Sequence, residues 1–155
     1  MFSSNSPFNR GQLPNMNNVI EIEDTKSMNA MLNSLKDDGR GGLKTKNNKE
    51  YSGKFDGKGG VKDVKESVVS KPSIGKPLVT DGNVDYHSHP SGSEKFQRGS
   101  KSYTGTWAQP PSKQDISVAS STKGSYKYLI GMQTQTIYVY NKSGVVATIP
   151  IKSFK

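Results

Sequence analysis

The feature that most constrains the fold is the motif His-Ser-His-Pro at residues 87–90, which holds both histidines of the chain. In an extended strand alternate side chains point to the same face, so the imidazoles of His87 and His89 would lie about 6 to 7 Å apart on one side of a sheet. That spacing suits chelation of a metal ion. The motif therefore predicts a strand over residues 83–89 with a metal-binding face; the alternative is a polar strand end that binds nothing.

A second motif, Ser-Lys-Gln-Asp at residues 112–115, follows two prolines and supplies a carboxylate. Ser-x-x-Asp at such a place is also typical of a helix start, with the serine as cap and the aspartate in the first turn. A helix beginning here would hold Asp115 against the histidine strand and complete a set of two nitrogens and one oxygen. Three protein ligands with one open position are the pattern of a catalytic rather than a structural zinc.

The string His-x-His-Pro followed by Ser-x-x-Asp resembles the signature of the JAMM/MPN metalloproteases, also called JAB domains, over about residues 48–120. A closer resemblance is to the JAB-like domains at the C-terminal ends of bacterial Rhs-type polymorphic toxins. It is carried by Tyr-His-Ser-His-Pro-Ser-Gly, Pro-Pro-Ser-Lys-Gln-Asp and Gly-Val-Val-Ala-Thr-Ile-Pro. The sequence departs from the family in the long spacer between the two motifs, and we interpret residues 91–111 as a loop insertion beside the site.

The resemblance implies a zinc-dependent peptidase or isopeptidase in which His87, His89 and Asp115 bind Zn²⁺. It gives the hydroxyl of Ser112 the role of holding the reacting water or the oxyanion. It also implies a proton carrier, which family members place on an earlier strand as a glutamate.

Glu50 is our candidate for this proton carrier, because Lys-Glu-Tyr-Ser-Gly at residues 49–53 resembles the strand start where the family places its glutamate. Glu66 is the alternative, and Glu21 or Glu23 would fit only if the first strand lies further upstream. A solvated surface carboxylate is the other interpretation of Glu50.

We expect a single α/β domain of JAB/MPN type over residues 19–155, preceded by a flexible tail or linker remnant at residues 1–18 that is rich in Ser, Asn, Gly and Pro. A mixed, mostly antiparallel sheet would be flanked by a helix over residues 24–38 and by the helix that begins near Ser112. The expected strands are 49–55, 61–69, 83–89, 126–130, 136–140 and 145–149, and residues 72–77 are expected to be loop.

The insertion carries aromatic side chains, among them Tyr103 and Trp107, within a long polar stretch rich in glycine. Long loops without structure of their own are usually functional or disordered. These aromatics would either cover the site and bind substrate or pin the loop to the domain.

The composition limits the partners. The chain contains no cysteine, which excludes disulfides and thiolate metal sites. The net charge of +9 favours acidic partners. However, the lysines of residues 36–76 are scattered among acidic residues without an interleaved aromatic platform, so we favour a solvated basic surface over a nucleic-acid groove.

No apolar run is long enough for a membrane span or for the core of a signal peptide. We therefore expect no membrane partner. Export would require another route, such as delivery into a target cell as part of a larger polypeptide; otherwise we expect a cytoplasmic protein.

Two function classes stay open at this point. The first is a zinc metallopeptidase, most plausibly an effector or toxin domain that acts on a protein substrate and is matched by a cognate immunity protein. The second is a non-catalytic JAB-like module that binds a partner. A basic domain that acts on nucleic acid is a third, weaker possibility, which a salt-sensitive interaction with DNA or RNA would support.

Overall fold

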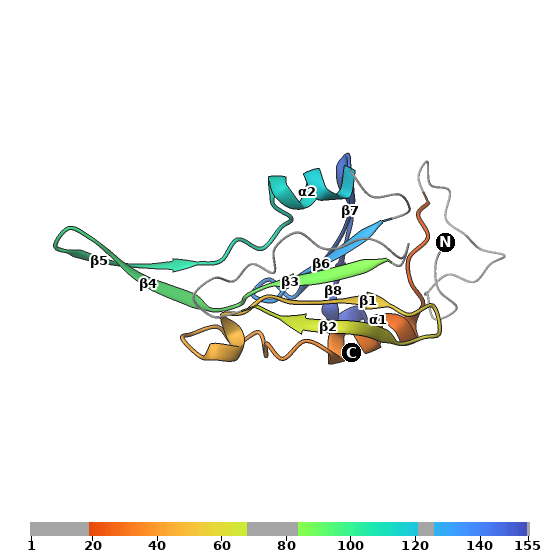
Figure 1. Cartoon of the computed structure of the whole chain (residues 1–155), viewed down its shortest axis with the longest axis horizontal. Coiled ribbons are helices and arrows are strands. Elements are labelled where there is room, and N and C mark those ends of the chain that lie inside the picture. Colours follow the sequence, from red (N-terminus) through yellow and green to blue (C-terminus); the bar gives the residue numbers. More distant parts are fainter. Residues whose placement is uncertain (1–18, 68–83, 121–125, 155) are drawn as a thin grey trace.

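The computed structural model describes residues 19–67, 84–120 and 126–154 (Figure 1). Six strands form one sheet in the order β2-β1-β3-β6-β7-β8, and β4 pairs only with β5. The helices are α1 (Thr25–Asn33) and α2 (Lys113–Ser120), with short 3₁₀ turns at Thr45–Asn47 and Ile151–Ser153. The strands are β1 (Tyr51–Phe55), β2 (Val61–Glu66), β3 (Asp85–His89), β4 (Ser93–Arg98), β5 (Lys101–Thr106), β6 (Lys127–Gly131), β7 (Thr136–Asn141) and β8 (Gly144–Pro150).

The large sheet is mixed. β3 and β6 pair in parallel, and the other neighbouring strands pair antiparallel. Parallel neighbours require a crossover connection, and here the crossover from β3 to β6 contains β4, β5 and α2. The expected α/β class, with a mostly antiparallel sheet and two helices, is confirmed, as is the antiparallel meander of β6, β7 and β8.

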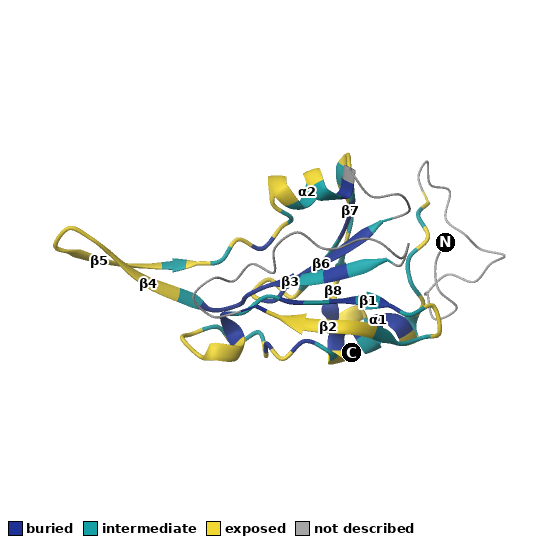
Figure 2. Cartoon of the chain, viewed as in Figure 1, coloured by how far each residue is buried: buried dark blue, intermediate teal, exposed yellow. Residues whose placement is uncertain are grey.

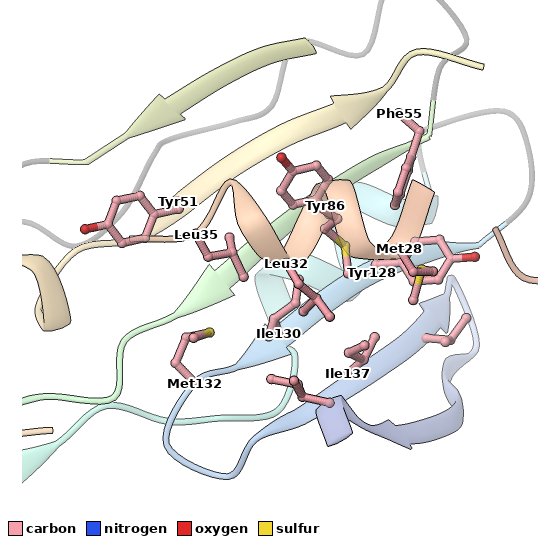
Figure 3. Close-up of a cluster of buried hydrophobic side chains, with 13 residues drawn as sticks. Met28, Leu32, Leu35, Tyr51, Phe55, Tyr86, Tyr128, Ile130, Met132 and Ile137 are labelled. Atoms are coloured by element: carbon pink, nitrogen blue, oxygen red, sulfur yellow. The ribbon is translucent and has the colours of Figure 1, made fainter. Parts of the chain in front are cut away.

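Helix α1 covers one face of this sheet. Asp24 caps it by accepting a hydrogen bond from the backbone N–H of Ser27 at 2.7 Å. The methionine and leucine positions spaced along α1 and just beyond it are buried against β1, β3, β6 and β7, and Figure 3 shows this cluster. Its members include Met28, Met31, Leu32, Leu35, Tyr51, Phe55, Tyr86, Tyr128, Ile130 and Ile137.

The helix is shorter than the predicted range of 24–38. It ends at Asn33, and the hydroxyl of Ser34 donates to the carbonyl of Met31 at 2.7 Å and lies 2.6 Å from that of Tyr86. Further along, the Asp37 carboxylate accepts a hydrogen bond from the N–H of Gly39. The local hydrogen bonds of Ser34 and Asp37 compete with helical continuation, and the contact of Ser34 with Tyr86 adds a tertiary constraint.

Helix α2 lies against the opposite face of the sheet. Ala119 and Ile116 pack there against Leu129 of β6 and Tyr140 of β7. This second apolar cluster is much smaller than the first, so polar side chains occupy much of the α2 face.

The prediction of a loop over residues 91–111 is wrong for its central part, which forms the β4–β5 hairpin. Phe96 and Tyr103 pair across the strands with stacked rings 5.5 Å apart, and Gly99 has a positive φ of 64° in the two-residue turn. Cross-strand aromatic pairs and a glycine in the turn both stabilise hairpins. We call this hairpin, residues 93–106, the arm. Figure 2 shows it as mostly exposed, projecting beyond the buried sheet.

The expected tail at residues 1–18 and the expected loop at residues 72–77 lie outside the described residues. Within the described ranges, no helix is long and apolar enough to cross a membrane.

Candidate metal centre

The alternation of side chains along β3 divides its residues between the two faces of the sheet. Tyr86 and Ser88 point to the α1 side, where the Ser88 hydroxyl accepts a hydrogen bond from the N–H of Tyr51 at 3.0 Å. His87 and His89 therefore point to the α2 side, with ring centroids 5.3 Å apart. Because β3 is an interior strand, paired with β1 and β6, its backbone holds both rings in place.

Asp115 lies in the first turn of α2, where it forms a reciprocal cap with Ser112. The N–H of Ser112 donates to Asp115 Oδ2 at 2.8 Å, and the N–H of Asp115 donates to Ser112 Oγ at 3.1 Å. The capping interpretation of Ser-x-x-Asp is thus confirmed. The same cap fixes the carboxylate of Asp115 toward the histidine strand.

The three expected ligands meet. His87 Nε2 lies 3.2 Å from Asp115 Oδ1, and His89 Nε2 lies 3.4 Å from Asp115 Oδ2. A tetrahedral metal with bonds of about 2.0–2.2 Å holds its ligand atoms roughly 3.3–3.6 Å apart. One ligand atom from each residue lies within 4.8 Å of the others, so the cluster could hold a metal ion. Without a metal, the two short distances suit hydrogen bonds from the imidazoles to the carboxylate.

The surroundings of Asp115 stabilise its ionised form. Burial favours its neutral form, but hydrogen bonds from His87, His89 and the N–H of Ser112 outweigh burial and hold the pKa of Asp115 well below its usual range. The carboxylate is therefore ionised at neutral pH, as a metal ligand must be.

Glu50 stands beside the cluster. The antiparallel register pairs Ser52 with His87, so Glu50, two residues earlier, lies next to His89. Its Oε1 is 3.7 Å from His89 Nε2, and its side chain is only 15% exposed. Ser67 exchanges two 2.9 Å hydrogen bonds with the backbone of Glu50, which fixes the residue just before β1. Glu50 is thus close to the three ligands without belonging to their set.

The other candidate glutamates lie elsewhere. Glu66 is exposed on the edge strand β2, where hydrogen bonds from Lys49 and Lys36, at 2.8 and 2.9 Å, lower its pKa to about 2. The backbone N–H of Glu23 donates to the hydroxyl of Tyr128, which belongs to the core on the α1 side. Among the four carboxylates considered from the sequence, the structure brings Glu50 to the ligands.

The aromatic residues of the insertion differ in position. Trp107 donates from Nε1 to Asn48 Oδ1 at 2.9 Å, so it pins the root of the arm to the domain. Tyr103 lies on the arm itself and is 43% exposed. Contact of either residue with a substrate stays a prediction.

Polar residues that the sequence did not single out share the same face. Asp85 Oδ1 lies 2.7 Å from Lys127 Nζ, with both side chains largely buried. Tyr140, opposite Lys127 in the β6–β7 register, is also buried. Its pKa is raised well above its usual range by burial and by the negative charges of Asp115 and Asp85. The sequence offered one signal for Asp85, because it precedes His87 by two positions and residues two apart in a strand face the same side of the sheet.

The second nitrogen of His89 is unusual. His89 Nδ1 is buried, and no hydrogen-bond partner for it lies within the part of the chain that the structure describes. A histidine that binds a metal through Nε2 carries its proton on Nδ1 and normally donates it to a carbonyl or carboxylate. Among the described residues that donor would have no partner, so the cluster could hold a metal ion but lacks one customary support.

No family model matches the sequence, and no curated protein or solved structure is significantly similar to it. The function must therefore be inferred from the residues of the centre and their geometry.

Proposed function

We propose that the chain is a zinc-dependent metallopeptidase or isopeptidase of JAMM/MPN type, with His87, His89 and Asp115 as the ligands of Zn²⁺. The observation that carries the proposal is the convergence of two imidazoles and one ionised carboxylate from β3 and α2, with Glu50 held beside them. A mixed sheet with a helix on each face is compatible with a JAB-like fold.

A zinc ion bound here would lower the pKa of a bound water to about 7 and polarise a scissile carbonyl. Glu50 supplies the base that accepts the proton from the water and returns it to the leaving amine. Its partly buried position suits this role, since it is near the ligands and fixed by Ser67.

Ser112 is the residue that we propose assists Glu50. Its Oγ accepts the N–H of Asp115, and a hydroxyl that accepts one hydrogen bond can still donate its own proton. The side chain is exposed at the start of α2, so it could donate to the reacting water or to the oxyanion. Such a donor stabilises the charge that develops during acyl transfer.

The substrate we propose is a protein, and the biological setting is a bacterial effector or polymorphic-toxin domain, delivered as part of a larger polypeptide. The charge of +9 would suit a cognate immunity protein with an acidic surface.

The test compares wild type with Glu50→Gln, using Glu66→Gln as the matched control on an exposed carboxylate. Zinc content is measured by elemental analysis, and growth inhibition is measured in a bacterial host that lacks an immunity protein. We expect one zinc per chain in all three proteins and loss of toxicity in Glu50→Gln alone, with turnover reduced about 10²- to 10⁴-fold.

Protein without stoichiometric zinc after zinc-supplemented expression would overturn the enzyme assignment. Bound zinc with equal toxicity of wild type and Glu50→Gln would instead favour the non-catalytic binding module.

A further inference from the structure

The side chain of Gln109, between the arm and α2, is buried and fully hydrogen-bonded. Its Nε2 donates to the carbonyls of Pro90 at 3.0 Å and Trp107 at 2.9 Å. Its Oε1 accepts from the N–H groups of Gln133 at 2.8 Å and Thr134 at 3.4 Å. Two donors and two acceptor sites are all that a primary amide has, so every position is used.

These partners belong to the three segments that surround the metal centre. Pro90 directly follows the ligand His89, and Gln133 and Thr134 form the turn between β6 and β7. Gln109 itself lies six positions before the ligand Asp115, in the segment that leads to α2. One amide therefore ties the end of the histidine strand to the start of the aspartate helix.

Other contacts fix the residues that directly precede the arm. The carboxylate of Asp37 accepts hydrogen bonds from the N–H of Ser91 at 2.8 Å and from its hydroxyl at 2.6 Å. The N–H of Gly92 donates to the carbonyl of Asn47 at 2.7 Å. These contacts anchor the residues after Pro90, whereas Gln109 joins the backbone that follows His89 to the segment that leads into α2.

We propose that Gln109 is a positioning residue of the metal centre, which sets the distance between Asp115 and the histidines. This inference rests on the proposed function, because it requires that the cluster binds a metal. Gln109 does not contact the ligand side chains; it acts through the backbone of Pro90 and through the chain that enters α2.

Glutamine meets this requirement because the position needs donors toward Pro90 and an acceptor toward Gln133. Methionine has a similar length and fills a similar volume, but it cannot make these hydrogen bonds. Glutamate keeps the acceptor, and in its ionised form it has no donor for the carbonyl of Pro90. Gln109→Met therefore removes all four hydrogen bonds. Gln109→Glu removes the two that Nε2 donates, including the link to β3.

The experiment titrates the metal-free protein with Co²⁺ and records the visible spectrum of the bound ion, which reports the number and geometry of its ligands. The variants are Gln109→Met and Gln109→Glu. The control is Gln97→Met, the same substitution at an exposed glutamine on the arm. Thermal unfolding of each metal-free protein checks the fold.

We expect Gln109→Met to weaken cobalt binding about 10- to 100-fold, as loss of a supporting contact around a metal site commonly does. We also expect a changed spectrum, because Asp115 is no longer held at its place. The control should match wild type in affinity and spectrum. If Gln109→Met does not fold, Gln109→Glu should show the same change in spectrum.

Wild-type affinity and spectrum in a folded Gln109 variant would overturn the positioning role while leaving the metal centre intact. Reduced affinity with an unchanged spectrum would also overturn it, since a merely destabilised fold gives that result. Failure of the wild type to bind cobalt or zinc would remove the proposed function itself.

Discussion

The two faces of β3 perform different tasks although they share one backbone. On the α1 side Tyr86 lies in a continuous apolar cluster, whereas on the α2 side His87 and His89 lie among carboxylates, a lysine and a tyrosine. Because side chains alternate along β3, residues that pack on the α1 side are interleaved with residues that face the candidate metal centre. Substitutions on the α1 side should consequently change the stability of the fold, and substitutions on the α2 side should change metal binding.

The energetic balance of the two faces also differs. Each large apolar side chain that is buried on the α1 side contributes roughly 1.5–3 kcal/mol to the free energy of folding. On the α2 side the buried pair Asp85–Lys127 must overcome the desolvation of both charges. His89 Nδ1 adds a buried polar atom without a partner among the described residues. The burial of apolar side chains on the α1 side therefore offsets the cost of burying polar groups on the α2 side.

The largest expected effect comes from His87→Ala. Removal of one of the three proposed ligands should abolish tight zinc binding, because only two protein groups then remain to bind the ion. The fold should persist, and the free energy of unfolding of the metal-free protein should change by no more than about 1 kcal/mol. Isothermal titration with Zn²⁺ and chemical denaturation measure the two quantities. A variant that binds zinc as tightly as wild type would contradict the ligand assignment.

Ser112→Ala should have the next largest effect. Loss of a single oxyanion or water contact costs about 10²- to 10³-fold in turnover, and loss of the helix cap costs about 0.5–2 kcal/mol in stability. Turnover of a cleavable protein substrate and thermal unfolding separate the two losses. Ser112→Thr retains a hydroxyl and serves as the control; equal activity of all three proteins would limit Ser112 to capping.

The smallest effect is expected on the apolar face, from Ile137→Val. Ile137 is fully buried on the α1 side, and loss of one methylene group should destabilise the protein by about 0.5–1.5 kcal/mol. Zinc stoichiometry and turnover of the folded protein should stay at wild-type values. A change in metal affinity would show that the two faces are coupled, which would break the separation described above.

Much of this arrangement followed from local sequence patterns, and the exceptions have physical reasons. The strands around Tyr51, His87 and Ile137 were predicted because their side chains alternate. The start of α1 was predicted from Asp24, but its end was not, since Ser34 and Asp37 make tertiary contacts that no local pattern reports. The arm was missed because its aromatic pair is separated by polar and glycine residues.

For the centre, His87, His89 and Asp115 were predicted to come together from their spacing and capping pattern, and they form a cluster that could hold a metal ion. Glu50 was selected by resemblance, and its proximity to His89 depends on the β1–β3 register. Lys127 and Gln109 were not predicted. Lys127 reaches Asp85 only because β6 pairs in parallel with β3, and Gln109 is buried by segments distant in sequence. Strand order and burial of this kind cannot be deduced from periodicity.

The position of the arm has a consequence for chain connectivity. A single cut at Gly99, in the exposed turn between β4 and β5, would leave both histidines in one fragment and Asp115 in the other. The parallel pairing of β3 with β6, the pairing of β4 with β5 and the apolar cluster between α1 and strands β6 and β7 would then join the fragments without a covalent bond. A metal ion bound by His87, His89 and Asp115 would add one further link between the two fragments, so chelation should lower their affinity for each other without separating them.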